Sequence, residues 1–262
     1  MNKNLPIFII VIVLIAAVVG GVALFRNPSP TPPGNSSSNN SNKASKQADA
    51  FNKVLGSAPQ GASPGWTKGD PAAKITLEEF ADFSCPTCAN FHQTLKEIEK
   101  SYGQKIKITY RHFPLQIKGH ENSYNASRAA EAAGIQGRFW EMQNMLFSNQ
   151  KVWTVQSEND ARNTFIDYAK SIGIDVEKFK EDMTNGQITA ARVAADMNRG
   201  KALDLNSTPS VILNNSRLLS NEEIIKIDLL RQAIEAELQK SAAPAASNSS
   251  GNSSGNSNQN AQ

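Results

Sequence analysis

The chain has 262 residues, a formal net charge of +3 and only two cysteines, which suggests one globular domain with appendages. The charge is modest and is not gathered in a basic block, so nucleic acid is not an expected partner. Two cysteines are too few for a structural disulfide framework, which needs several bridges, or for a structural zinc site, which needs four ligands.

The N-terminal part predicts a membrane anchor. Residues 5–25 carry no charge, and at about 1.5 Å per residue a helix of this length crosses the roughly 30 Å hydrocarbon core of a bilayer. The run is longer than the apolar stretch of about 7–15 residues in a cleaved signal peptide. We therefore favour an uncleaved transmembrane anchor over a signal peptide, with residues 1–4 on the cytoplasmic side.

Two polar stretches flank the predicted domain. Residues 26–60 are interpreted as a flexible tether because much of this stretch is rich in Ser, Asn and Pro. A short helix is expected near its end, at 48–55. Residues 241–262 are mostly Ser, Asn, Gly and Ala without charge, and they predict a disordered tail. The globular domain is therefore expected at 61–240.

A buried strand is predicted at residues 75–83. Side chains alternate between the two faces of a strand, so Glu79 shares a face with the apolar residues Ile75 and Leu77. Glu78 falls on the other face. By parity, Glu79 is expected among apolar neighbours, where a carboxyl group holds its proton more easily than in water.

Cys85 and Cys88 follow this strand, and a helix is predicted to begin between them. Pro86 suits the first helical position, because its missing N–H group would have no partner there in any case. Cys85 is then at the N-cap, and Cys88 opens an apolar stripe that faces the core. The stripe is made of residues spaced by three and four: Cys88, Phe91, Leu95, Ile98 and Tyr102.

This geometry predicts a dithiol whose two sulfurs have different roles. The unpaired N–H groups and the positive dipole end of the helix would surround the Cys85 sulfur and lower its pKa from about 8.5 into the range of roughly 3.5–7.5. The Cys85 thiolate would be the nucleophile in disulfide exchange. The buried Cys88 would then resolve the mixed disulfide, and Glu79 could exchange a proton with Cys88 as it reacts.

Other interpretations of the same residues stay open at this point. A close cysteine pair can also bind metal, and a site formed by Cys85, Cys88 and His92 is geometrically possible but one ligand short. Asp82 could act on the Cys85 thiolate or could simply cap the turn. We expect no metal ion and no cofactor beyond the two thiols.

The rest of the domain predicts strands interrupted by a block of helices. Residues 105–112 alternate as a strand with one wetter face, and residues 211–219 predict a hairpin. Ser220 and Glu223 form a capping box for a single last helix. Between the strands, helices are expected at 122–133, 138–148, 158–172, 176–184 and 187–202.

Five ordered motifs between Gly69 and Leu219 together resemble one bacterial family. They are residues 69–71 (Gly-Asp-Pro), 79–88 (Glu-Phe-Ala-Asp-Phe-Ser-Cys-Pro-Thr-Cys), 110–115 (Tyr-Arg-His-Phe-Pro-Leu), 130–140 (Ala-Glu-Ala-Ala-Gly-Ile-Gln-Gly-Arg-Phe-Trp) and 206–210 (Asn-Ser-Thr-Pro-Ser). In this order they resemble the DsbA-like thiol–disulfide oxidoreductases, in particular their membrane-anchored branch. The resemblance implies an α/β thioredoxin-like fold with a helical insertion at about 118–205, preceded by one transmembrane helix.

The resemblance also implies roles for individual residues. Cys85 matches the nucleophile, Cys88 the resolving thiol and Glu79 the buried acid of the family. Thr208 and Pro209 match the loop whose proline is cis and lies against the active-site sulfurs. The backbone of Thr208 would then pair with an extended client segment, as an added strand does.

The implied partners are client proteins with cysteines and a membrane redox partner that recycles the dithiol. A disulfide-forming site belongs in an oxidising compartment, so the domain is expected on the extracytoplasmic side of the cell membrane, held by a single span. The dipeptide Pro86-Thr87 departs from the Pro-His pair of strongly oxidising relatives. This departure leaves the redox potential open. An oxidase is the favoured interpretation because the helix start stabilises the Cys85 thiolate of the reduced form, which raises the potential. A reductase or isomerase and a thiol metal-binding protein stay as alternatives.

Overall fold

The computed structural model describes residues 51–242. The predicted anchor at 5–25, most of the tether at 26–60 and nearly all of the tail at 241–262 lie outside the described residues and stay predictions. Among the described residues, no helix is long and apolar enough to cross a bilayer. The described part begins with a helix at 51–57, close to where the sequence predicts a short helix leading into the domain.

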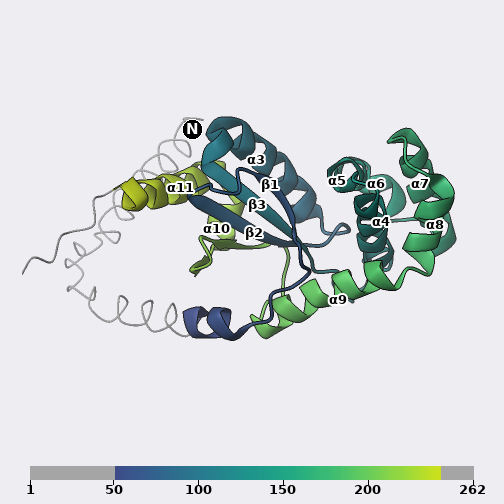
Figure 1. The fold of residues 1–262 in the computed structure, drawn as a ribbon, viewed down its shortest axis with the longest axis horizontal. Helices are drawn as coiled ribbons and strands as arrows, with labels where there is room; N and C mark the ends of the chain where they lie inside the picture. The colour runs from purple at the N-terminus through teal and green to yellow at the C-terminus, as the bar shows by residue number, and fades with distance from the viewer. Residues whose placement is uncertain (1–50, 243–262) are drawn as a thin grey trace, which may run out of the picture. The chain divides into compact units, whose positions relative to one another are not determined.

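One mixed sheet is formed by five strands of the described part (Figure 1). The strands are β1 (Trp66–Gly69), β2 (Ile75–Ala81), β3 (Ile106–His112), β4 (Ser210–Leu213) and β5 (Arg217–Leu218). Their order in the sheet is β1-β3-β2-β4-β5, and only the central pair, β2 and β3, runs parallel. In that pair Ala81 lies opposite His112, so both strands end at the same edge of the sheet.

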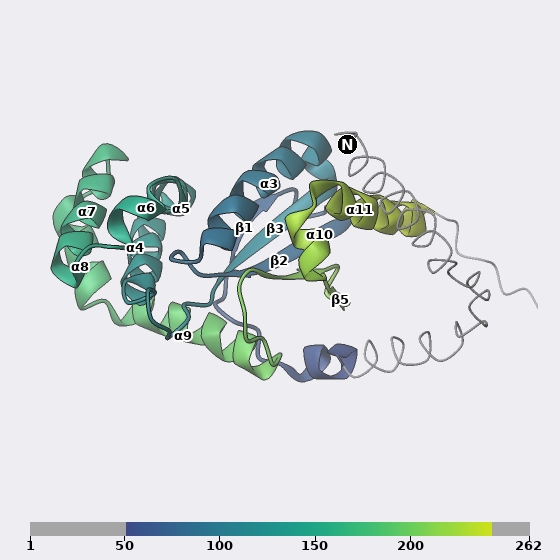
Figure 2. The ribbon, with the colours of Figure 1, turned by 180° about the vertical axis from the view of Figure 1, so that it is seen from behind.

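Different helices cover the two faces of the sheet (Figures 1 and 2). On the face of Ile75 and Leu77, the buried Leu95 and Ile234 come from two helices that lie side by side. On the opposite face, Phe80 packs with Leu55 of the helix at 51–57 and with Leu203 and Leu205, which follow directly after a long helix. The three long helices concerned are α3 (Pro86–Tyr102) and α11 (Ile227–Ala242) on the first face and α9 (Gln187–Ala202) on the second.

The chain forms the predicted helical insertion between β3 and β4 (Figure 1). Its helices are α4 (Ser123–Ile135), α5 (Phe139–Ser148), α6 (Gln150–Trp153), α7 (Glu158–Ser171), α8 (Val176–Thr184) and α9. The short helix α6 is the one that the sequence did not predict. Phe139, Trp153 and Phe165 are buried in one cluster with Phe83 and Tyr110. The insertion therefore shares a core with the end of the sheet where β2 and β3 finish.

The C-terminal segment partly differs from the prediction. The hairpin β4–β5 and the capping box at Ser220 are present, but the prediction of a single last helix is wrong. The backbone is extended at Lys226, between α10 (Asn221–Ile225) and α11. Ile224 and Leu230 are both buried, whereas on one continuous helix they would point about 120° apart. The break lets both side chains reach the core.

Candidate redox-active dithiol site

The two cysteines lie where β2 passes into α3. Cys85 is the N-cap residue of α3, with φ −75° and ψ 119°, and Pro86 follows in the first turn. The Cys85 N–H group donates to the Asp82 carbonyl oxygen at 3.1 Å, which closes the turn before the helix. Cys85 is 8% exposed, Cys88 is fully buried, and both are free thiols. The cysteines thus occupy the helix positions that the periodicity predicts.

The surroundings separate the acidities of the two thiols. The neighbouring Cys88 thiol lowers the pKa of Cys85 to about 5 against the effect of burial, helped by the Thr208 side chain and by the N–H groups of Cys88 and Thr87. Burial raises the pKa of Cys88 well above its ordinary value, and the adjacent Cys85 and Glu79 raise it further. At neutral pH, Cys85 is therefore the thiolate and Cys88 the protonated thiol.

The loop before β4 lies against the Cys85 sulfur. Cys85 Sγ is 3.3 Å from the carbonyl oxygen of Thr208, and the Thr208–Pro209 peptide bond is cis, as the resemblance implies. Ser210, the first residue of β4, pairs with Phe80 of β2, so the register of the sheet holds the loop in place. A groove of about 190 Å³ beside the loop is lined by Thr87, Ser207, Thr208, Pro209, Asn221, Ile224 and Ile225.

Glu79 is buried on the α3 face of β2, with 2% of its surface exposed, in agreement with its parity. In the sheet it lies between Tyr110 of β3 and Val211 of β4. Burial raises the pKa of Glu79 to about 8, although the charge of Lys68 opposes this shift. Within residues 51–242 its Oε1 atom has no hydrogen-bond partner. The carboxyl group is therefore mostly protonated at neutral pH and able to exchange its proton.

Asp82 organises the turn that carries the cysteines. It is fully buried, and its carboxylate accepts hydrogen bonds from the Ser84 N–H at 2.7 Å, the Leu115 N–H at 2.7 Å and His120 Nδ1 at 2.7 Å. The Ser123 hydroxyl also donates to it. Of the two roles considered for Asp82 from the sequence, the structure shows the turn-capping one.

His92 does not join the cysteines. Its Nε2 lies 2.9 Å from Asn144 Oδ1, and its ring stacks on Phe147 at 5.0 Å. Burial lowers the pKa of His92 to about 4. Within residues 51–242, neither cysteine belongs to a group of three or more side chains placed to share a metal ion. The described residues thus supply no third ligand for a metal at Cys85 and Cys88.

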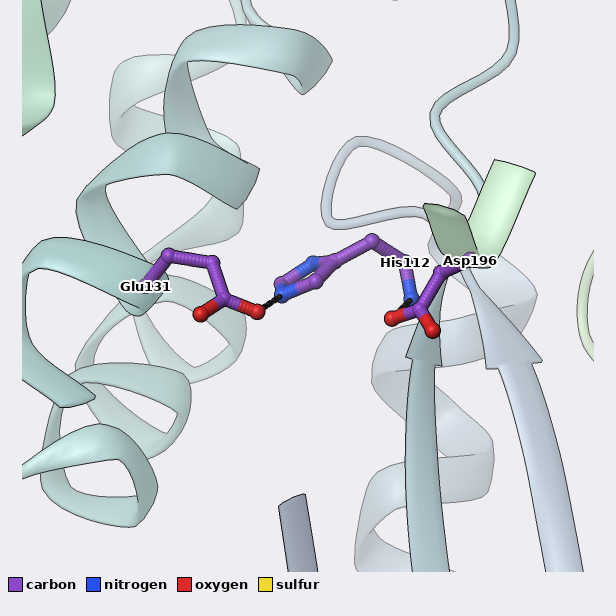
Figure 3. A group of neighbouring side chains, drawn as sticks. All are labelled: His112, Glu131 and Asp196. Atoms are coloured by element: carbon purple, nitrogen blue, oxygen red, sulfur yellow. Dashed lines mark hydrogen bonds and ion pairs between the residues drawn. The ribbon is translucent and has the colours of Figure 1, made fainter. Parts of the chain in front are cut away.

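A buried network that sequence reasoning missed joins the sheet to the insertion (Figure 3). His112 Nε2 of β3 lies 3.0 Å from Glu131 Oε1 of α4, and the His112 backbone N–H donates to Asp196 Oδ2 of α9 at 3.1 Å. Glu131 also pairs with Arg192, and Asp196 with Arg111. Because an arginine already pairs with each carboxylate, we interpret the cluster as a structural network that connects β3 with α4 and α9, and not as a metal site. The one sequence signal was that His112 and Glu131 both lie in motifs of the resemblance.

Comparison with known proteins agrees with this architecture. The family model described as "Thioredoxin" matches residues 62–236, and the chain belongs to this family. In fold it is similar to BdbD of Bacillus subtilis, at 24% identity and a TM-score of 0.59 over 70% of this chain and 98% of that one. It is also similar to the thiol–disulfide exchange protein alpha-DsbA2 of Wolbachia pipientis, at 17% identity and a TM-score of 0.57 over 73% and 97%. The predicted thioredoxin-like α/β fold with its helical insertion is confirmed.

One relative by sequence is a much longer protein than this chain. The Na(+)/H(+) antiporter NhaA 1 of Mycolicibacterium gilvum is 35% identical over 151 residues, which are 57% of this chain but 23% of that protein. The chain thus spans about a quarter of the length of such relatives.

Proposed function

We propose that the protein is a thiol–disulfide oxidoreductase that donates disulfides to secreted or membrane proteins through Cys85 and Cys88. The observation that carries this proposal is the pair of unlike thiols at one helix start. Cys85 sits at the N-cap with a pKa of about 5, and Cys88 lies buried behind it with a raised pKa. One sulfur is suited to react with a client and the other to complete the exchange.

The exchange would run in two steps from the oxidised enzyme. A client thiolate attacks Cys85 Sγ, the Cys85–Cys88 bond breaks, and Cys88 leaves and takes up a proton, for which Glu79 is the nearby buried acid. A second client thiolate then attacks the client sulfur of the mixed disulfide, and Cys85 leaves as a stabilised thiolate. The client loses two electrons to the enzyme disulfide, which becomes the dithiol that a membrane redox partner would reoxidise.

The loop at Thr208 and Pro209 is proposed to hold the client during these steps. The Thr208 carbonyl lies within 3.3 Å of Cys85 Sγ, so a client segment that reaches the sulfur also reaches this backbone. An extended segment can add to such backbone as an extra strand, which fixes its course without selecting its sequence. The same contacts would serve a reductase or isomerase, so the direction of electron flow needs a separate test.

The reduction potential of the Cys85–Cys88 pair is expected to lie above that of thioredoxin, which is about −270 mV. The Cys85 thiolate exists only in the reduced form, so the groups that lower its pKa stabilise the reduced form and raise the potential. Equilibration with glutathione buffers measures this value. A potential at or below that of thioredoxin would favour the reductase instead.

A Glu79→Gln variant is expected to slow disulfide exchange by roughly 100-fold, at the low end of the usual general acid–base contribution. Because the folded-state pKa of Glu79 is raised from 4.5 to about 8, the wild type loses stability as the pH rises through this window, and the variant does not. Stopped-flow exchange and unfolding at several pH values test both effects. Glu97→Gln, an exposed change on α3, is the control. Equal exchange rates for Glu79→Gln and wild type would leave Glu79 with only a structural role.

We further propose that residues 5–25 anchor the chain, that 26–60 tether the domain at 61–240, and that the domain faces the extracytoplasmic side. The uncharged run is long enough to span a bilayer, and proteins named as Na(+)/H(+) antiporters match part of this chain. Sodium carbonate is expected to leave the protein in the membrane, and protease added to spheroplasts should digest it. Deletion of residues 5–25 should release it. Carbonate extraction of the full chain, or complete protection from protease, would contradict the arrangement.

A further inference from the structure

One side chain of the helical insertion holds the active-site turn directly. Gln150 Nε2 donates to the Phe83 carbonyl oxygen at 2.7 Å and to the Cys85 carbonyl oxygen at 2.9 Å. Gln150 is the first residue of α6 and is 7% exposed. A side-chain amide carries two N–H donors, one for each carbonyl. Gln150 therefore bridges two peptide groups of the turn, one before and one after Ser84.

The partners determine which way this amide points. If it were flipped, its oxygen would face two carbonyl oxygens, and none of the three could donate. The helix α6, which carries this amide, is fixed by hydrogen bonds to other parts of the insertion. Trp153 Nε1 donates to the Leu146 carbonyl oxygen at 2.8 Å, and Asn122 Nδ2 donates to the Trp153 carbonyl oxygen at 3.1 Å. The amide is thus presented to the turn by a well-fixed part of the insertion.

The direction of the Cys85 carbonyl sets how α3 begins. This carbonyl also accepts the N–H group of Ala89 at 3.2 Å, as the first hydrogen bond of the helix. With its oxygen held by both Gln150 and Ala89, the backbone of Cys85 is fixed at ψ 119°. This angle sets the position of the N–H groups of Thr87 and Cys88 relative to the sulfur. Those N–H groups are among the ones that favour the thiolate.

We propose that Gln150 is a positioning residue of the dithiol site: by fixing the peptide group of Cys85, its amide keeps the sulfur against the start of α3, ready to react. The inference rests on the proposed function, because it matters only if Cys85 reacts as a thiolate. In this proposal the helical insertion affects the reactivity of Cys85 through Gln150, without itself contacting the client protein.

The test is Gln150→Met in the full chain, which keeps most of the side-chain volume and removes both donors. We expect the pH midpoint of Cys85 thiolate formation, followed by ultraviolet absorbance of the reduced protein, to rise by about one unit. Asn149→Ala is the matched control, because Asn149 Nδ2 donates to the Met145 carbonyl oxygen at 2.9 Å and not to the turn. The control should leave the midpoint unchanged.

Gln150→Glu is the second variant and serves if the methionine variant does not fold. At this buried position, against two carbonyl oxygens, the new carboxyl group should hold its proton and donate to only one of them. The midpoint should therefore rise, but by less than with methionine. If wild-type Cys85 titrates as an ordinary thiol, the proposed function is wrong and this inference with it. If wild-type Cys85 titrates low and the folded variants match it, the function stands and the role of Gln150 is wrong. If neither variant folds, Gln150 is a structural residue and the proposal is overturned.

Discussion

A Cys88→Ser variant is expected to accumulate mixed disulfides with client proteins, whereas Cys85→Ser should form almost none. Cys85 is at the edge of the site and Cys88 is fully buried, so only Cys85 can meet a client sulfur. Without Cys88 the enzyme has no internal disulfide, so the complex forms when the Cys85 thiolate attacks a client disulfide, the reverse of the proposed exchange. The Cys88 thiol that would attack this mixed disulfide and release the client is then missing. Non-reducing electrophoresis of cell extracts measures the trapped complexes. Trapping through Cys88 in the Cys85→Ser variant would reverse the assignment.

The pH dependence of alkylation gives an independent check on the same roles. With a pKa of about 5, Cys85 at about pH 6 carries roughly 300 times the thiolate fraction of an ordinary cysteine. The weaker nucleophilicity of a low-pKa thiolate cancels a factor of about 30 to 50, which leaves a net gain of roughly tenfold. Mass spectrometry of the reduced wild type should find Cys85 labelled first, at a rate that stops rising above about pH 6. A rate that climbs up to about pH 8 would mean that the thiolate is not stabilised.

The parts of the site that local rules determine could be predicted from the sequence. The burial of Glu79 follows from strand parity with Ile75 and Leu77. The unlike positions of Cys85 and Cys88 follow from a proline at the start of an apolar helical stripe. Strand alternation and helical spacing each depend on only a few neighbouring residues. The folded protein keeps the burial of Glu79 and the two cysteine positions that these local patterns predict.

The parts that depend on distant segments could not be predicted. Gln150 meets the Cys85 carbonyl across 65 residues of chain, and Asp196 meets the Ala62 N–H across 134. The helix α6 is too short to show a periodicity. The helix break at Lys226 allows Ile224 and Leu230 both to be buried. The need for this break arises from the tertiary packing and not from the local sequence. Before that core is known, the residues of these contacts look like ordinary polar positions.

Replacing Glu131 with alanine is expected to lower the free energy of unfolding by about 3–5 kcal/mol, the usual effect of removing one partner from a buried ion pair. Glu131 is fully buried. Its carboxylate accepts hydrogen bonds from His112 Nε2 at 3.0 Å, Trp66 Nε1 at 2.8 Å and Arg192 Nε at 2.6 Å. The variant would leave these donors without their acceptor, and two of them lie on the sheet. The loss should therefore loosen the insertion from the sheet.

Denaturant unfolding of the reduced protein at several pH values measures this effect, with Glu177→Gln as the control. Glu177 is 83% exposed and, among residues 51–242, forms an ion pair only with Lys180 across a helix turn, so its change should stay within about 0.5 kcal/mol. Burial raises the pKa of Glu131, but His112 and Arg192 outweigh it and hold the pKa below the ordinary 4.5. The contribution of Glu131 is therefore present above about pH 4.5 and is lost as the pH falls through the lower folded-state pKa. The difference between wild type and Glu131→Ala should shrink in that acid range. A difference below about 1 kcal/mol at neutral pH would mean that the network does not tie the insertion to the sheet.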